Sequence, residues 1–240
     1  MMIVRGRQCV LLAVACMVLV SSGFAQDRPV FRSDFIVRDA SALDALIRLG
    51  EVYRRPIGVI VTDKSILAPV TVRAISATIQ DVLPALLKQL PKYRSEEVRG
   101  VIVVRPISPA APLRQLLSVR LKEFDAPKAN IVQIGRVLWM ELRRNVDPVP
   151  PSGFFGISHE PIMDQTAIGP FHLAGANVED VLSEIVRRHG AAAWLVLSPP
   201  KQLSGVTSNR LWNLVTYANP PKPLEKLCCV NWSDLESFEE

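Results

Sequence analysis

The residues best suited to chemistry are three histidines in the second half of the chain: His159, His172 and His189. His159 stands beside Glu160, and Asp164 follows closely, so imidazole and carboxylate groups could together bind a metal ion. Their spacing does not favour such a site, because helical zinc sites place two histidines four residues apart. We therefore expect no metal ion and no cofactor.

Other catalytic patterns are also missing from the sequence. No serine stands in a G-x-S-x-G turn, and no glycine-rich phosphate loop is present. The acidic residues Glu51, Glu96 and Glu97 lack a plausible partner for acid–base catalysis and are interpreted as surface carboxylates. These observations predict a non-catalytic protein, unless groups from distant positions assemble a site that spacing does not reveal.

Three arginine pairs could form a stripe that binds an anionic polymer or lipid: residues 54–55, 143–144 and 187–188. Each pair falls at the C-terminal end of a predicted helix, where a positive charge complements the helix dipole by about 0.3–1 kcal/mol. The formal net charge of +5 also includes Arg5 and Arg7, which belong to a predicted export signal. We therefore expect no nucleic-acid partner.

The first 25 residues have the pattern of that signal. Arg5 and Arg7 precede an apolar run at residues 10–20, and cleavage is expected after Ala25. The apolar run is shorter than the roughly 20 residues of a membrane span. We therefore expect a periplasmic or secreted protein without a stable span after cleavage, the alternatives being an uncleaved anchor or lipidation at Cys16.

Cleavage would leave two adjacent cysteines, Cys228 and Cys229. A disulfide between neighbours is strained, because their Cα atoms lie about 3.8 Å apart and ordinary bridges need about 4.4–6.8 Å. We interpret the pair as two thiols in a C-terminal tail, and a redox switch or an intermolecular link stays open.

The elements that position these residues follow from hydrophobic patterns. In the first part of the chain, helices are predicted at residues 41–53 and 78–90, the second capped by Thr78 with Asp81. Strands are predicted at residues 34–38, 57–61, 70–73, 93–96 and 100–104. The continuous apolar run at residues 57–61 is typical of a strand covered on both faces.

This skeleton resembles the short N-terminal domain of secretins and TonB-dependent receptors. The resemblance rests on apolar segments at residues 35–37, 43–46, 57–59, 69–72, 82–87 and 101–104, together with Tyr93. It implies a periplasmic docking module and supplies no catalytic residue. Unlike in secretins and receptors, no pore-forming or barrel segment follows, so we expect a free-standing protein.

The second part of the chain resembles the first. Asp39-Ala40-Ser41 matches Asp125-Ala126-Pro127, and residues 78–83 match residues 177–182 at a longer offset. The longer offset predicts an inserted loop at residues 145–170, which are rich in proline and glycine. Here the predicted strands lie at residues 116–121, 171–173, 191–197 and 210–217, and the predicted helices at residues 127–144 and 177–190.

These patterns predict an α+β fold of two similar small β-α-β-β-α-β-β units, each with two helices packed on short mixed sheets. The expected boundaries are a signal at residues 1–25, a docking domain at 31–106, a divergent second copy at 113–218 and a tail at 219–240.

The expected function is docking to another envelope protein, a component of a secretion, pilus or TonB-type system. Contact is expected through an exposed strand edge at Val101 and Val103 and through Phe154 and Phe155 of the inserted loop. The alternative is a small-ligand-binding or hydrolytic domain that uses the 145–170 loop.

Overall fold

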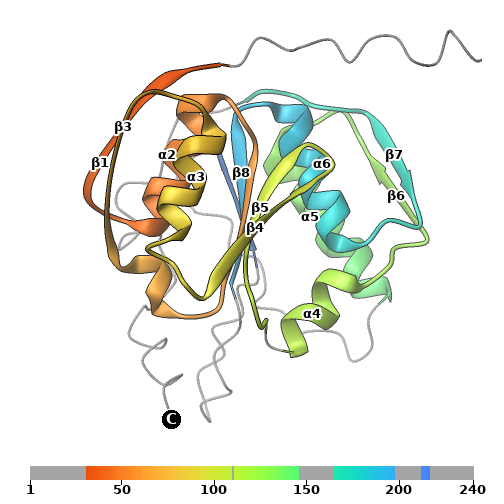
Figure 1. The fold of residues 1–240 in the computed structure, drawn as a ribbon. Helices are drawn as coiled ribbons and strands as arrows, with labels where there is room; N and C mark the ends of the chain where they lie inside the picture. The colour runs from red at the N-terminus through yellow and green to blue at the C-terminus, as the bar shows by residue number, and fades with distance from the viewer. Residues whose placement is uncertain (1–30, 110, 146–164, 198–211, 217–240) are drawn as a thin grey trace, which may run out of the picture. The chain divides into compact units, whose positions relative to one another are not determined.

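The computed structural model describes residues 31–109, 111–145, 165–197 and 212–216 of an α+β protein (Figure 1). The elements of the first part occur in the predicted order of strands and helices. They are β1 (Ser33–Ser41), α2 (Ala42–Tyr53), β2 (Ile57–Val61), the 3-10 helix η1 (Lys64–Leu67), β3 (Pro69–Ala77), α3 (Ile79–Leu87), β4 (Tyr93–Val98) and β5 (Val101–Pro106).

The second part contains three helices and four strands within the described residues. They are α4 (Ala111–Ser118), β6 (Glu123–Ala126), α5 (Ile131–Asn145), β7 (Phe171–Ala174), α6 (Val178–His189), β8 (Ala192–Leu197) and β9 (Trp212–Thr216). The segment that would correspond to β2 in a second copy lies at residues 146–164, outside the described residues. The internal repeat therefore stays a prediction.

Three helices begin where side chains satisfy their first backbone N–H groups. The Ser41 hydroxyl accepts a hydrogen bond from the Asp44 N–H at 3.0 Å, and β1 turns directly into α2 there. Capping boxes open α3 at Thr78, as the sequence predicts, and α6 at Asn177. Gly190 ends α6 in the left-handed conformation.

The strand predicted at residues 116–121 is wrong, because the structure has helix α4 in its place up to Ser118. Pro112 stands in its first turn, where proline is tolerated, and Leu113, Leu116 and Leu117 have helical spacing. Leu117 is buried. The next helix, α5, begins at Ile131 rather than at Pro127, because Asn130 accepts a hydrogen bond from the Gln133 N–H at 3.0 Å.

The main sheet contains strands from both parts of the chain, in the order β4-β5-β2-β8-β9. β2 lies parallel to β5 on one side and to β8 on the other, and the outer pairs β4–β5 and β8–β9 are antiparallel. All five residues of β2 are buried. The prediction of a strand covered on both faces is confirmed. The two predicted units share this sheet instead of having one each.

Alternating side chains of the main sheet belong to two hydrophobic cores. On one face, Val59, Val104 and Leu195 pack with residues of α2 and α3. On the other face, Val103 and Trp194 pack with residues of α5 and α6. Figure 1 shows these helix pairs on opposite sides of the sheet.

Two antiparallel ribbons complete the described structure: β1 with β3, and β6 with β7. The β1–β3 ribbon buries Phe35, Val37, Val70 and Val72 against the α2–α3 side of the molecule. Among the helices that the structure describes, none is both long and apolar enough to cross a membrane.

Candidate docking site beside strand β1

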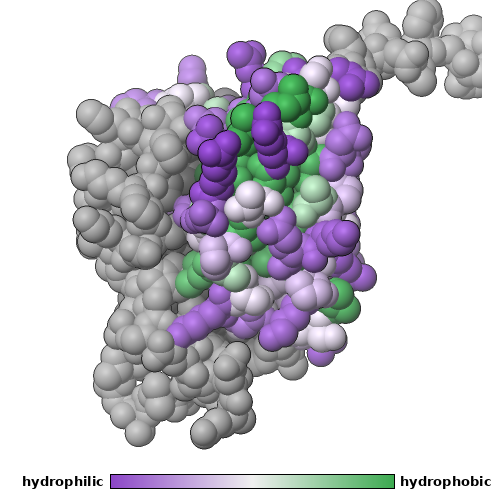
Figure 2. Space-filling view, turned by 60° about the vertical axis from the view of Figure 1, so that its left-hand side comes forward, coloured by the Kyte–Doolittle hydropathy of each residue, from purple (hydrophilic) through white to green (hydrophobic). Residues whose placement is uncertain are grey.

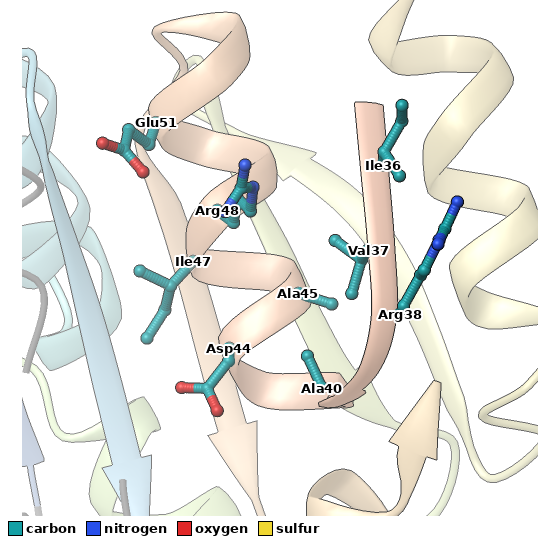
Figure 3. A pocket seen from close by; sticks show the side chains of 9 residues that line it. All are labelled: Ile36, Val37, Arg38, Ala40, Asp44, Ala45, Ile47, Arg48 and Glu51. Carbon is teal, nitrogen blue, oxygen red and sulfur yellow. The ribbon is translucent and has the colours of Figure 1, made fainter. Parts of the chain in front are cut away.

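A groove of about 300 Å³ lies between β1 and α2 (Figure 3). β1 and α2 form its two walls, because the chain reverses direction at Ser41 where the strand becomes the helix. The groove is lined by Ile36, Val37, Arg38, Ala40, Asp44, Ala45, Ile47, Arg48 and Glu51.

The lining shows that the groove follows the edge of β1 that faces away from β3. Successive side chains of a strand point to opposite faces, so a groove on one face would be lined by every second residue. The consecutive residues Ile36, Val37 and Arg38 all line this groove, so it lies along the edge of the strand. No residue of β3 contributes to the lining. Among the described strands, β1 pairs only with β3, so alternate residues along its outer edge present N–H and C=O groups to no neighbouring strand.

The helix wall is a single stripe of α2. Asp44, Ile47, Arg48 and Glu51 are three or four residues apart and share one side of the helix. In Figure 3, Asp44, Ile47 and Glu51 point away from β1, whereas Ala45 points toward it. The Asp44 carboxylate accepts a hydrogen bond from the Ser41 hydroxyl at 2.6 Å, which holds it at the end where strand and helix meet. α2 therefore borders the edge of β1 without covering it.

The groove has an apolar floor and a charged rim. Val37, Ala45 and Ile47 are buried, and Val37 and Ala45 point toward each other. Arg38, Arg48 and Glu51 are exposed around them. Ile36 is 40% exposed and points with Arg38 away from the helix. Figure 2, which brings the β1 side forward, shows an apolar band between hydrophilic side chains.

The β3 edge is closed and the β4 edge is charged. The Gln89 side chain of the α3 end accepts a hydrogen bond from the Thr71 N–H at 3.2 Å and donates one to the Thr71 carbonyl at 3.1 Å. Gln89 thus takes the place of a neighbouring strand beside β3. The β4 edge of the main sheet exposes Arg94, Glu96 and Glu97, and charged residues discourage strand pairing. β1 is therefore better prepared than β3 or β4 to accept another strand.

Two of the four predicted contact residues are not on the surface. Val101 and Val103 are fully buried in the core shared with α6, and their strand β5 lies between β4 and β2. These two side chains cannot reach a partner unless that core opens. Phe154 and Phe155 lie outside the described residues.

The histidines are placed as follows. His159 and Asp164 lie outside the described residues, and His172 pairs with Asp125 on the exposed face of β7 at 2.8 Å. His189, at the end of α6, accepts a hydrogen bond from the Ala191 N–H at 3.3 Å. Within the described part of the chain, no three His, Cys, Asp or Glu residues are grouped to hold a metal ion.

Arginines of all three predicted pairs form ion pairs within the protein. Arg55 contacts Glu97 at 3.0 Å, and Arg144 contacts Glu141 at 2.6 Å. Arg187 and Arg188 both bind Glu184, which is buried. These contacts favour the structural interpretation of the pairs over a binding stripe.

Sequence reasoning missed the β1 groove, although one signal was present. Phe35, Ile36 and Val37 are all apolar, whereas a strand with one solvated face should alternate. Phe35 and Val37 enter the core, which leaves Ile36 on the surface. An apolar residue on the outer face of a ribbon is the type of residue that a partner strand covers.

Comparison of the chain with family models, curated proteins and solved structures finds no significant match.

Proposed function

We propose that the protein is an exported docking protein of the cell envelope, which binds an extended segment of another envelope protein along β1. The observation that carries this proposal is the unpaired β1 edge beside a groove with an apolar floor. A strand added there gains main-chain hydrogen bonds, and its alternate side chains enter the groove. The resemblance of residues 31–106 to the short N-terminal domain of secretins and TonB-dependent receptors agrees with such a role.

Site-specific photocross-linking in cells tests the docking edge. A photoreactive residue in place of Ile36 should capture one envelope protein through an extended segment. The same residue in place of Met140 is the control, because Met140 is 49% exposed on α5, which covers the opposite face of the sheet.

The captured segment is then tested as a synthetic peptide. At a concentration where sedimentation shows the protein to be monomeric, the peptide should slow hydrogen exchange of backbone amides in β1 and leave those of β4 unchanged, because only β1 gains hydrogen-bond partners. Equal capture from both positions, or a peptide that leaves β1 exchange unaltered, would refute docking at this edge.

Export is tested separately, because the proposal places the partner in the envelope. The N-terminal signal predicts that the protein in the periplasmic fraction begins at Gln26. Full-length chain retained in the cytoplasm would contradict the export part of the proposal and leave the groove itself unaffected.

A further inference from the structure

The outward face of β1 carries a short charge pattern that is complementary to itself. Asp34, Ile36 and Arg38 alternate with the buried residues Phe35 and Val37, so their side chains share the outer face of the ribbon. Ile36 and Arg38 point the same way in Figure 3. The face therefore presents an acid, an apolar residue and a base in that order.

Two such strands fit each other when they run antiparallel. If Ile36 lies opposite Ile36 of a second copy, then Asp34 lies opposite Arg38 of that copy, and Arg38 opposite its Asp34. Residues directly opposite in an antiparallel pair have Cβ atoms about 4.5–5.5 Å apart, close enough for both ion pairs and for the isoleucine contact. This arrangement has the two-fold symmetry of most homodimers.

The groups needed for this pairing are available. No hydrogen bond or ion pair joins Arg38 to another residue of the described part of the chain. Asp34 uses one carboxylate oxygen to accept a hydrogen bond from the Ser76 N–H at 2.8 Å, which leaves the second oxygen for an arginine. The pairing of β1 with β3 is regular from Phe35 to Val37 and shifts on either side of that stretch. The regular stretch is thus centred on Ile36, and Asp34 and Arg38 lie just beyond its two ends, where the register shifts.

We infer that, in the absence of its partner, the β1 edge is covered by β1 of a second copy of this chain. The two ribbons then form one continuous sheet in the order β3-β1-β1-β3, with exposed Ile36 residues in contact across the two-fold axis. Dimerisation closes the proposed docking edge, so the partner segment and the second copy compete for it. The competition rests on the proposed function, whereas the dimer does not.

Charge-swapped full-length chains test the dimer by sedimentation equilibrium over a concentration series. Arg38→Asp places acids opposite acids in a like pair, and Asp34→Arg places bases opposite bases. Each variant alone should dimerise at least about tenfold more weakly than the wild type, because two attractive cross-strand pairs become repulsive. Arg136→Asp, at an exposed position of α5, is the control and should dimerise normally.

The decisive sample is an equimolar mixture of the two single variants. Each Asp34→Arg chain then finds complementary charges on an Arg38→Asp chain, so the mixture should form heterodimers although neither variant dimerises well alone. Misfolding of either variant cannot produce this recovery. A wild type that stays monomeric throughout, or a mixture no more dimeric than its components, would overturn the inference.

Cysteine cross-linking gives a second readout. In a chain that begins at Gln26, and so lacks Cys9 and Cys16, with Cys228 and Cys229 replaced by serine, Ile36→Cys should oxidise to a disulfide-linked dimer. Ile75→Cys, at the more exposed Ile75 of β3, should not, because it lies away from the two-fold axis. If both dimer tests fail and photocross-linking still finds an envelope partner, the dimer is refuted and the proposed docking function is retained.

Discussion

At the scale of single residues, the junction of β2 and β8 depends on one glycine. Gly58 lies opposite Trp194 in the parallel register, and a Cβ atom at Gly58 would come within 2.2 Å of the indole ring. Trp194 is fully buried, and its Nε1–H donates a hydrogen bond to the Ser183 hydroxyl at 3.3 Å. The ring therefore has little freedom to move aside.

Gly58→Ala is expected to destabilise the protein by about 1–3 kcal/mol, because the added methyl group would clash with the indole ring of Trp194. Urea unfolding followed by fluorescence measures this cost. The same substitution in a Trp194→Leu background should cost less, because the ring that it meets is gone. Equal costs in both backgrounds would show that the close approach does not limit the strand pairing.

Glu184 is the second residue on which stability depends. Its carboxylate accepts hydrogen bonds from Arg187 Nε and Nη2, both at 2.7 Å, and from Arg188 Nε at 2.5 Å. The Arg187 side chain, ahead of Arg188, holds the pKa of Glu184 below its ordinary value of 4.5. The charged carboxylate therefore stabilises the folded state above that pH, and the contribution is lost as the pH falls through the lowered pKa.

Glu184→Gln should lower the free energy of unfolding at pH 7 by about 1–2 kcal/mol, since hydrogen bonds to a charged group are lost. The difference from the wild type should shrink as the pH falls below about 4.5, where Glu184 of the unfolded chain takes up a proton, and should be lost as the pH falls through the lowered pKa of the folded state. Urea unfolding at several pH values measures both effects. Glu141→Gln is a milder control, because its partner Arg144 is largely exposed. A pH-independent difference would contradict the ionic explanation.

At the scale of elements, α2 and α3 pack through apolar stripes into one core. Leu46 of α2 and Leu86 of α3 are both fully buried there, although α3 contains Pro84. The Thr78–Asp81 capping box fixes where α3 begins, and the pKa of Asp81 is lowered chiefly by the hydrogen bond from the Thr78 backbone. By fixing the first residue of α3, the cap determines which side of the helix, including Leu86, faces the core.

Leu86→Ala should destabilise the protein by about 2–5 kcal/mol, because the cavity left in this core cannot collapse fully. Thermal or urea unfolding gives the value. Leu83→Ala, at a half-buried position of the same helix, should cost less. A loss below about half a kcal/mol at Leu86 would show that this face of the helix does not support the core.

At the scale of the whole molecule, ion pairs as well as strands join the two parts of the chain. Arg99, in the β4–β5 turn, contacts Asp180 of α6 at 2.9 Å, and Arg105 of β5 binds both Glu96 and Glu179. Burial, opposed by the nearby Arg105 charge, raises the pKa of Glu179. The N-terminal end of α6 is thereby attached to the β4–β5 hairpin.

A fragment of residues 31–106 should not behave as a stable monomer. Without the second part, it would expose Ile60, Val101 and Val103 and leave one edge of β2 unpaired. Size-exclusion chromatography and circular dichroism should show aggregated or unfolded material. A monomeric fragment that unfolds cooperatively would establish residues 31–106 as an independent domain. The pairing of β2 with β8 would then be a contact between two separately folded parts.

The sequence by itself determined most local features of this protein. Apolar spacing and caps located α2, α3 and α6, and the continuous run at residues 57–61 predicted a strand covered on both faces. It failed at residues 116–121, because a short apolar run fits a helix or a strand about equally well.

Only the tertiary structure decided which strands are neighbours. The hydrophobic pattern predicts that Val101 and Val103 are buried, but it does not identify the elements that cover them. That surface comes from α6 and β8, and their pairing with the first part depends on packing between residues far apart in the chain. β8 covers the inner edge of β2 and Gln89 closes β3, so within the β1–β3 ribbon the edge left for another strand is that of β1.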